Sequence, residues 1–329
     1  MAKVLITGGA GFIGLHLAKY YLSMGHKVDL ADNFSRGIND EELNSVLENE
    51  NVNLYKVDLM DKESVKQLGD DYDYIFHLAA IIGVANVLKQ PYNVLEKNAI
   101  LLINMLDFAK TQKNLKRFLF ASTSEVYAGT LLNFEMEIPT PETTPLCTTD
   151  LKSARTSYML SKIYGEALCN HSGLPVTIFR PHNIYGPRMG MAHVIPELLK
   201  KAYALKGGEK LDVFSPEHKR TFCYIDDAVK ILYLAAESDK TLNETINLGN
   251  QSPEVPMKTV GEIVLKTVGK NNEMNFLPPT EGSPERRCPD MTKTAELTGF
   301  SAEVSLEEGV KRTYDWYRAN YFEKESVLV

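Results

Sequence analysis

The chain has 329 residues, of which 44% are hydrophobic and 24% are charged, and its formal net charge is −7 at pH 7. This length can bury a full core in one large domain or two modest ones, and an acidic chain without a basic block argues against nucleic acid as a partner. Every apolar run is too short to span a membrane, and we expect no signal peptide before the first strand, so the sequence predicts a cytoplasmic protein without a membrane partner.

The first expected elements are a strand, a turn and a helix. An apolar strand at residues 3–7 runs into a turn that holds Gly8, Gly11 and Gly14, and a helix is expected over 11–24. Glycines let a backbone turn tightly and approach a pyrophosphate, while the start of the following helix offers amide groups and the positive end of its dipole. This order of elements favours a dinucleotide site over a tight turn without a ligand.

A second apolar strand is expected at residues 27–31, and Asp32 follows directly at its end. A carboxylate about 20 residues after the glycines can accept hydrogen bonds from the ribose hydroxyls of an adenosine. The same negative charge repels the 2′-phosphate that distinguishes NADP from NAD. The sequence therefore predicts NAD as the cofactor.

Strands and helices continue to alternate along the first half of the chain, which is typical of a doubly wound parallel sheet with helices on both faces. Strands are expected at 52–57, 74–80, 117–122 and 175–180, and helices at 64–68, 98–111 and 157–171. The composition changes after Pro181. In the second half we expect strands at 212–214 and 245–248, helices at 196–205, 260–268 and 306–321, and a segment at 220–237 that begins extended and continues as a helix.

We therefore expect an α/β fold with two parts. A Rossmann-type NAD-binding domain over 1–181, rejoined by 220–250, would carry a smaller substrate-binding α/β cap formed by 182–219 and 251–329. The four cysteines are scattered without Cys-x-x-Cys spacing, so we expect reduced thiols and no metal site.

The predicted helix at 157–171 carries a Tyr-x-x-x-Lys pair, Tyr158 and Lys162. Positions four apart share one face of a helix, and a nearby ammonium favours the phenolate and lowers the pKa of a tyrosine. Such a tyrosine can take a proton from a sugar hydroxyl while a hydride leaves for NAD. This pair alone occurs by chance on many helices, but Thr123 also stands at the end of the fifth predicted strand, where doubly wound sheets bind ligands.

Taken together, these motifs resemble the extended short-chain dehydrogenase/reductases, an NAD-dependent family of nucleotide-sugar epimerases, dehydratases and decarboxylases. The resemblance covers nearly the whole chain. It includes Asn98, Tyr158, Lys162 and the segments 7–14, 32–34, 58–59, 77–80, 122–127, 180–183, 220–228 and 287–290.

The resemblance implies a role for individual residues. The catalytic set would be Thr123, Glu125, Tyr158 and Lys162. The cofactor would contact Gly8, Gly11, Phe12, Ile13, Gly14, Asp32, Asn33, Asp58, Leu59, Leu78, Ala79, Ala80, Asn98, Tyr158, Lys162 and Pro181. A nucleotide-sugar substrate would contact Asn183, Arg188, His193, Arg220 and Arg287, with Arg220 at a position that commonly holds the diphosphate. The planar fork of arginine suits phosphate.

The helices at 98–111 and 157–171 resemble those that pair across a homodimer in this family. The first of them is apolar on nearly every side, which fits burial between two subunits and equally fits a core helix of one subunit. We expect a homodimer.

The reaction itself depends on Glu125. Oxidation of a sugar C4 hydroxyl to a ketone acidifies the C5 proton and eases the loss of a C6 carboxylate, so one intermediate allows epimerisation, dehydration or decarboxylation. Thr123-Ser124-Glu125 is similar to the Thr-Ser-Glu of GDP-mannose 4,6-dehydratases and UDP-glucuronate decarboxylases, where a carboxylate can move a proton or position the departing group. We therefore favour dehydratase or decarboxylase chemistry.

Two alternatives stay open. A 4-epimerase acting on a sugar such as UDP-glucose, UDP-glucuronate or UDP-N-acetylglucosamine would use the same intermediate, with Glu125 only bonding backbone at the strand end. A protein that binds NAD(H) as a signal and catalyses nothing is the more remote alternative, because such proteins typically lose the tyrosine or the lysine, and this chain keeps Thr123, Tyr158 and Lys162.

Overall fold

The computed structural model describes residues 1–279 and 283–326. Within these residues no helix is both long enough and apolar enough to cross a membrane. The largest feature is a seven-stranded sheet with the order β11-β6-β5-β4-β1-β2-β3, in which every pair of neighbours is parallel. Its strands are β1 (Lys3–Thr7), β2 (Lys27–Asp32), β3 (Val52–Lys56), β4 (Tyr74–His77), β5 (Arg117–Ala121), β6 (Val176–Pro181) and β11 (Glu244–Leu248).

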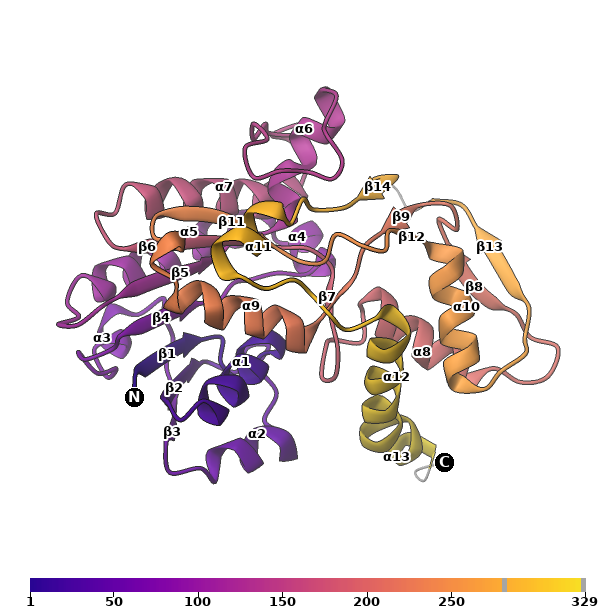
Figure 1. Cartoon of the computed structure of the whole chain (residues 1–329), viewed down its shortest axis with the longest axis horizontal. Helices are drawn as coiled ribbons and strands as arrows, with labels where there is room; N and C mark the ends of the chain where they lie inside the picture. Colours follow the sequence, from indigo (N-terminus) through magenta and orange to yellow (C-terminus); the bar gives the residue numbers. More distant parts are fainter. Residues whose placement is uncertain (280–282, 327–329) are drawn as a thin grey trace.

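Helices cover both faces of this sheet, as the side chains of β1 illustrate by pointing alternately to the two faces. Val4 and Ile6 pack into one core with helix residues such as Leu15, whereas Leu5 packs into a second core on the opposite face with Leu102. One face carries α1 (Phe12–Ser23), α2 (Glu41–Leu47) and α9 (Ile225–Glu237), and the other carries α3 (Lys62–Val65), α5 (Pro91–Ala109) and α7 (Thr156–Asn170) (Figure 1). The predicted doubly wound fold is thereby confirmed.

The chain crosses from β1 to β2 on one side and places β4 on the other side of β1. At such a switch point the loops after two neighbouring strands diverge and leave a crevice at their carboxyl ends. In this protein the crevice lies beyond β1 and β4, and the glycine-rich turn forms one wall of it. This is where the sequence predicts the cofactor.

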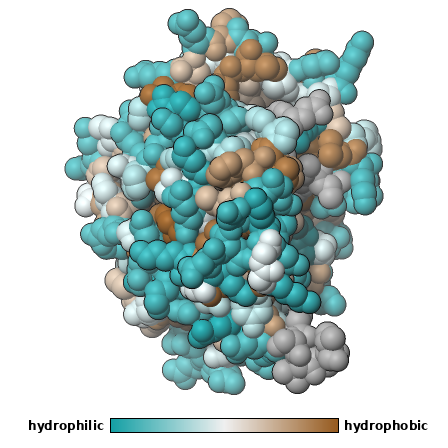
Figure 2. Space-filling model, turned by 90° about the vertical axis from the view of Figure 1, so that its right-hand side faces the viewer, coloured by the Kyte–Doolittle hydropathy of each residue, from teal (hydrophilic) through white to brown (hydrophobic). Residues whose placement is uncertain are grey.

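A second group of elements, which we call the C-terminal lobe, lies beside the sheet (Figure 1, right). It contains α8 (Val194–Ala204), β8 (Leu211–Phe214), α10 (Met257–Val268), β13 (Met274–Leu277) and α12 (Leu306–Tyr317). Its outer face is largely hydrophilic with scattered hydrophobic patches (Figure 2). Between β8 and α10 the chain returns to the main sheet. There α9 packs on α1, and β11 pairs with β6.

Short strands connect the two parts of the molecule. The pairs are β7 (Ile184–Tyr185) with β10 (Cys223–Tyr224), and β9 (Lys219–Arg220) with both β12 (Val255–Pro256) and β14 (Arg286–Arg287). The remaining elements are α4 (Val84–Lys89), η1 (Ser124–Tyr127), α6 (Ala128–Asn133), η2 (Asp239–Thr241), α11 (Thr292–Thr298), η3 (Arg318–Phe322) and α13 (Glu323–Ser326).

Two differences from the predicted elements have local causes. Helix α5 begins at Pro91, seven residues before the expected start at Asn98, because proline is well tolerated at the first helical position, where its missing N–H costs nothing. The 306–321 helix ends its regular α-helical part at Tyr317 and continues with wider turns over Arg318–Phe322. The short helices α4 and α6 are not predicted from the sequence.

Candidate active site

The turn after β1 can be built only with glycine at key positions. Gly8 has φ +69°, and a Cβ added to it would lie 3.1 Å from the Ala79 nitrogen. A Cβ at Gly14 would lie 2.4 Å from the Gly8 oxygen, which no real contact allows. No side chain caps the start of α1 at Gly11, and the first turn of that helix carries no acidic residue. Uncapped amides at a helix start fit the pyrophosphate of NAD.

Asp32 braces this turn. One of its carboxylate oxygens accepts a hydrogen bond from the Ala10 N–H at 3.0 Å, and the other accepts one from the Phe34 N–H at 2.8 Å. The side chain is 9% exposed, and burial raises its pKa. Each carboxylate oxygen keeps a further lone pair, so Asp32 can still accept hydrogen bonds from ribose hydroxyls.

Asn98 acts on the opposite wall of the crevice. Its Oδ1 accepts a hydrogen bond from the Ile81 N–H at 2.7 Å, and its Nδ2 donates to the Ile81 oxygen and to Ser161 Oγ. It therefore fixes the segment that follows β4. The other residues predicted to contact NAD stand at the start of α1 or at or just past the ends of β2, β3, β4 and β6: Phe12, Ile13, Asn33, Asp58, Leu59, Leu78, Ala79, Ala80 and Pro181.

Tyr158, Lys162 and Thr123 meet at the carboxyl end of β5. The Lys162 ammonium donates a hydrogen bond to the Ala121 oxygen at 2.8 Å and lies 5.8 Å from the centre of the Tyr158 ring. The Tyr158 hydroxyl is hydrogen-bonded to Thr123. The helix spacing and the strand end thus bring together three of the four residues that the sequence predicts as catalytic.

Burial dominates the protonation of this group. It raises the pKa of Tyr158 to about 12, although the hydrogen bond with Thr123 and the charge of Arg36 act in the other direction. It also lowers the pKa of Lys162 to about 8. The sequence predicts a lowered pKa for Tyr158, but in the protein alone desolvation of the phenolate outweighs the groups that lower this pKa. The positive nicotinamide ring of a bound NAD would favour the phenolate.

Glu125 faces the same crevice and binds across it. Its Oε1 accepts a hydrogen bond from Arg287 Nη2 at 2.9 Å, and Arg287 belongs to β14, 162 positions away along the chain. Its backbone N–H donates to Thr123 Oγ1 at 3.2 Å. The Glu125 carboxylate is therefore bound to an arginine side chain rather than to backbone at the strand end.

Arg220 lies beside Arg287, because β9 and β14 pair with these two residues in register. Burial and the charge of Arg287 lower the pKa of Arg220 to about 10. The Nη1 and Nη2 groups of Arg220 donate to the Lys219, Pro284 and Glu285 oxygens and to Ser283 Oγ, whereas Arg287 pairs with Glu125. The two neighbouring guanidinium groups make a positive region, and positive charge of this kind suits a diphosphate. Asn183 donates from Nδ2 to the Thr221 oxygen at 2.9 Å, and His193 stands at the start of α8.

Arg188 is placed differently from its predicted role as a substrate ligand. Its side chain is 1% exposed and forms an ion pair with Asp40. The other N–H groups donate to backbone oxygens of the glycine-rich turn and of Ile38. No donor of this guanidinium is left for a substrate, so we correct that prediction.

Sequence reasoning did not find a buried network behind the catalytic residues. Glu166 forms a two-pronged ion pair with Arg180, at 2.9 Å and 2.6 Å, and accepts a hydrogen bond from Ser122 at 2.5 Å. Glu166 follows Lys162 by four residues on the same face of α7, so the spacing that revealed Tyr158 and Lys162 could have revealed it too.

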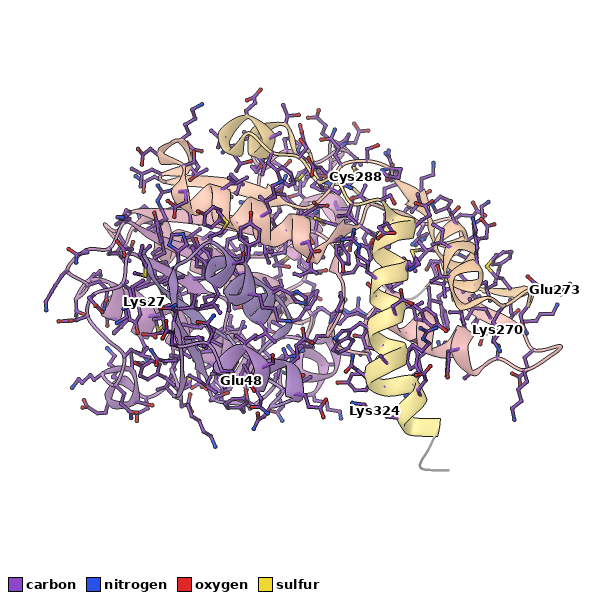
Figure 3. All side chains as sticks on the ribbon, turned by 60° about the horizontal axis from the view of Figure 1, so that its bottom comes forward. Lys27, Glu48, Lys270, Glu273, Cys288 and Lys324 are labelled. Atoms are coloured by element: carbon purple, nitrogen blue, oxygen red, sulfur yellow. The ribbon has the colours of Figure 1, made fainter. Side chains whose placement is uncertain are left out.

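Cys288 is a landmark for the segment that carries Arg287 (Figure 3). Cys288, directly after Arg287, lies where the chain passes between the main sheet and the C-terminal lobe, whereas Lys270 and Glu273 lie at the far end of that lobe (Figure 3). A surface hollow of about 650 Å³ beside Lys270 and Glu273 contains none of the predicted site residues. The candidate active site is therefore the crevice between the two parts.

Comparison with known proteins identifies the family. The model of the NAD dependent epimerase/dehydratase family matches residues 4–249. The chain belongs to this family. Its similarity to individual members extends over almost its full length. UDP-N-acetyl-alpha-D-glucosaminuronate decarboxylase of Bacillus cytotoxicus is 35% identical over 96% of this chain and 98% of its own length. UDP-glucuronic acid decarboxylase 1 of Xenopus tropicalis is 32% identical over 96% of this chain and 72% of its own length.

A solved member of the family has the same fold. UDP-glucuronic acid 4-epimerase of Bacillus cereus, in complex with UDP-glucuronic acid and NAD, superposes with a TM-score of 0.79 and 27% identity over 97% of this chain and 100% of the other. The predicted family, NAD as the cofactor and an enzyme that modifies a nucleotide sugar are thereby confirmed.

Proposed function

We propose that this family member decarboxylates a UDP-linked uronic acid through a transient 4-keto sugar. The observation that carries the proposal is the ion pair between Glu125 and Arg287 beside Thr123 and Tyr158. A 4-epimerase needs only the residues that move the C4 hydrogen. An arginine and a carboxylate next to these residues supply, in addition, a binding partner for a C6 carboxylate. The two decarboxylases described above support this choice.

The first step removes hydrogen from C4. NAD, when bound, accepts the hydride from C4 and returns it at the end of the cycle. Tyr158 takes the proton of the C4 hydroxyl, and Thr123, which is hydrogen-bonded to Tyr158, holds the same oxygen. Lys162 stabilises the phenolate by its charge, and its bond to the Ala121 oxygen fixes the position of that charge.

The second step breaks the bond between C5 and C6. A ketone at C4 makes the sugar a β-keto acid, so carbon dioxide leaves and the electron pair of the broken bond moves onto the C4 oxygen as an enolate. The hydroxyls of Thr123 and Tyr158 stabilise this oxygen. We propose that Arg287 binds the C6 carboxylate before it leaves and that Glu125 promotes its departure and helps to return a proton to C5.

The proposal is tested by the mass of the product. The protein with NAD is incubated with UDP-glucuronate or UDP-N-acetylglucosaminuronate, and the nucleotide sugars are then separated and weighed by mass spectrometry. We expect a product lighter by one carbon dioxide. A product of unchanged mass that separates from the substrate would instead mean a 4-epimerase, and a loss of water would mean a dehydratase. If no sugar reduces the bound NAD, the protein would instead be one that binds NAD without catalysis.

We further propose that the enzyme is a cytoplasmic homodimer that pairs through α5 and α7. These helices pack against each other and leave Tyr92, Ile103 and Tyr164 with 71%, 36% and 48% of their surface exposed, which a second subunit would cover. All four cysteines are free thiols, as in a reducing compartment. Light scattering should give twice the chain mass for the wild type, and Ile103→Glu should shift it toward the monomer. A monomeric wild type would exclude this interface.

A further inference from the structure

We propose that Arg188 is a positioning residue for NAD, which holds the glycine-rich turn in the shape that binds the pyrophosphate. This role concerns the cofactor of the family and is independent of which reaction the enzyme performs. Arg188 is a buried arginine that comes from the loop leading to the C-terminal lobe and reaches back to the first turn of the chain.

All five N–H groups of the Arg188 guanidinium are used within the protein. Nε and one Nη2 hydrogen bind Asp40, at 2.7 Å and 3.2 Å. The second Nη2 hydrogen goes to the Ile38 oxygen at 2.7 Å. Both Nη1 hydrogens bind the turn itself, the Ala10 oxygen at 2.9 Å and the Gly11 oxygen at 3.2 Å. A fully paired, rigid fork of this kind fixes the geometry of the groups that it touches.

These two carbonyl groups control the direction of the amides that follow them. In a planar trans peptide, the C=O of one residue and the N–H of the next point in opposite directions. Because Arg188 holds the Gly11 oxygen, the Phe12 N–H at the start of α1 points away from Arg188. On the other side, Asp32 holds the Ala10 N–H at 3.0 Å. Asp32 and Arg188 therefore hold adjacent groups of the turn, namely the Ala10 N–H and the Ala10 and Gly11 oxygens.

The loop that carries Arg188 is itself firmly held. Arg188 has φ +67°, a left-handed conformation that side-chain-bearing residues seldom adopt and that local contacts must maintain. The Pro187 oxygen accepts a hydrogen bond from His16 Nε2 of α1 at 3.1 Å, and burial lowers the pKa of His16 to about 4, so the ring is neutral. The Tyr317 hydroxyl of α12 donates to the Met189 oxygen. This loop thus joins α1 to the C-terminal lobe.

Binding of cofactor fragments to the full-length protein, freed of NAD, tests the proposal. Adenosine lacks the pyrophosphate, whereas ADP and NAD contain it. For Arg188→Met, which keeps the length of the side chain and removes its donors, calorimetry should show a loss of affinity of about tenfold or more for ADP and NAD. Adenosine should bind within about twofold of the wild type. Arg188→Lys should lie between the two.

Arg312→Met is the matched control, because Arg312 forms its ion pairs with Glu308 and Asp226 on the surface, and all three ligands should bind to it as to the wild type. If Arg188→Met does not fold, Asp40→Asn serves instead, since it weakens the anchor of the guanidinium and should lower the affinity for ADP and NAD several-fold. Equal losses for adenosine and ADP in a folded variant, or no loss for either, would overturn the proposal. These measurements involve no turnover and are independent of the decarboxylation assay.

Discussion

At the residue scale, the chemistry rests on side chains that the backbone brings to the end of β5. Tyr158 and Lys162 are one helical turn apart, so their proximity follows from the sequence alone. The pKa values do not, because they depend on how completely other elements bury the two groups. Burial raises the pKa of Tyr158 in the protein alone, so we expect its phenolate to form only when a further positive charge, such as the nicotinamide ring, lies nearby.

Replacing Tyr158 by phenylalanine should abolish turnover and leave NAD bound. The variant loses the hydroxyl that takes the C4 proton but keeps the ring and its packing. General-base catalysis typically contributes about 10²-fold to 10⁴-fold to the rate. The rate of product formation and the NAD content of the purified protein check this. Turnover at the wild-type rate would remove Tyr158 from the catalytic set.

Replacing Glu125 by glutamine should slow decarboxylation by about 10² or more while the C4 oxidation continues. Reduced NAD, followed by its absorbance, would then accumulate with little loss of carbon dioxide. Glu254→Gln is the matched control, because Glu254 also pairs with an arginine, Arg286, which directly precedes Arg287 in β14, and we expect it to retain activity. Equal slowing of both steps in Glu125→Gln would assign Glu125 a structural role.

At the element scale, the start of α1 and the turn before it act as one unit. The turn requires glycine because the backbones of residues 8 and 14 approach closely, and the helix supplies the amides. Helix α7 likewise presents Tyr158, Lys162 and Glu166 on one face, and the last of these ties the helix to Arg180 in β6. The helical spacing places these three side chains on one face, and the Glu166–Arg180 ion pair fixes that face against the sheet.

The substitution Gly14→Ala should weaken NAD binding by at least about tenfold. Its Cβ would lie 2.4 Å from the backbone oxygen of Gly8, so the turn must open, and overpacking of this kind also costs about 1–3 kcal/mol of stability. Calorimetric titration with NAD and the thermal midpoint measure the two effects. Gly207→Ala, where a Cβ meets nothing within 4 Å, should leave NAD affinity unchanged. Unchanged affinity in Gly14→Ala would mean that the turn does not hold the pyrophosphate.

At the scale of the whole molecule, the sheet and the C-terminal lobe meet at the crevice, and polar contacts join them. Trp316 of α12 donates to Glu42 of α2 at 3.0 Å, and the loop with Arg188 lies between the same two parts. The proposed site draws Tyr158 from one part and Arg287 from the segment between the parts. Catalysis by this protein would therefore depend on their relative position.

Buried neutral histidines should make the fold sensitive to acid. Burial lowers the pKa of His77 and His182 to about 3 and that of His16 to about 4, whereas unfolded histidine titrates near 6.5. Because the unfolded chain binds more protons, the stability that these groups contribute is complete above about pH 6.5 and is lost as the pH falls toward 4. Denaturant unfolding at pH 7.5, 6 and 5 should show that the free energy of unfolding decreases steadily as the pH is lowered. His16→Gln should reduce this slope, and an unchanged slope would exclude a contribution from His16.

The order of the elements, the glycine turn, the carboxylate at the end of β2 and the Tyr-x-x-x-Lys pair could all be predicted from the sequence. All of these depend on neighbours within a few turns or one βαβ unit, where the chain geometry leaves little choice. The partners of the arginines, by contrast, could not be predicted and became known from the folded arrangement. Glu125 and Arg287 are 162 positions apart, and Arg188 and Ala10 are 178 apart. An arginine looks the same in sequence whether it faces a substrate or is fully paired inside the fold, and only the packing of distant segments distinguishes the two.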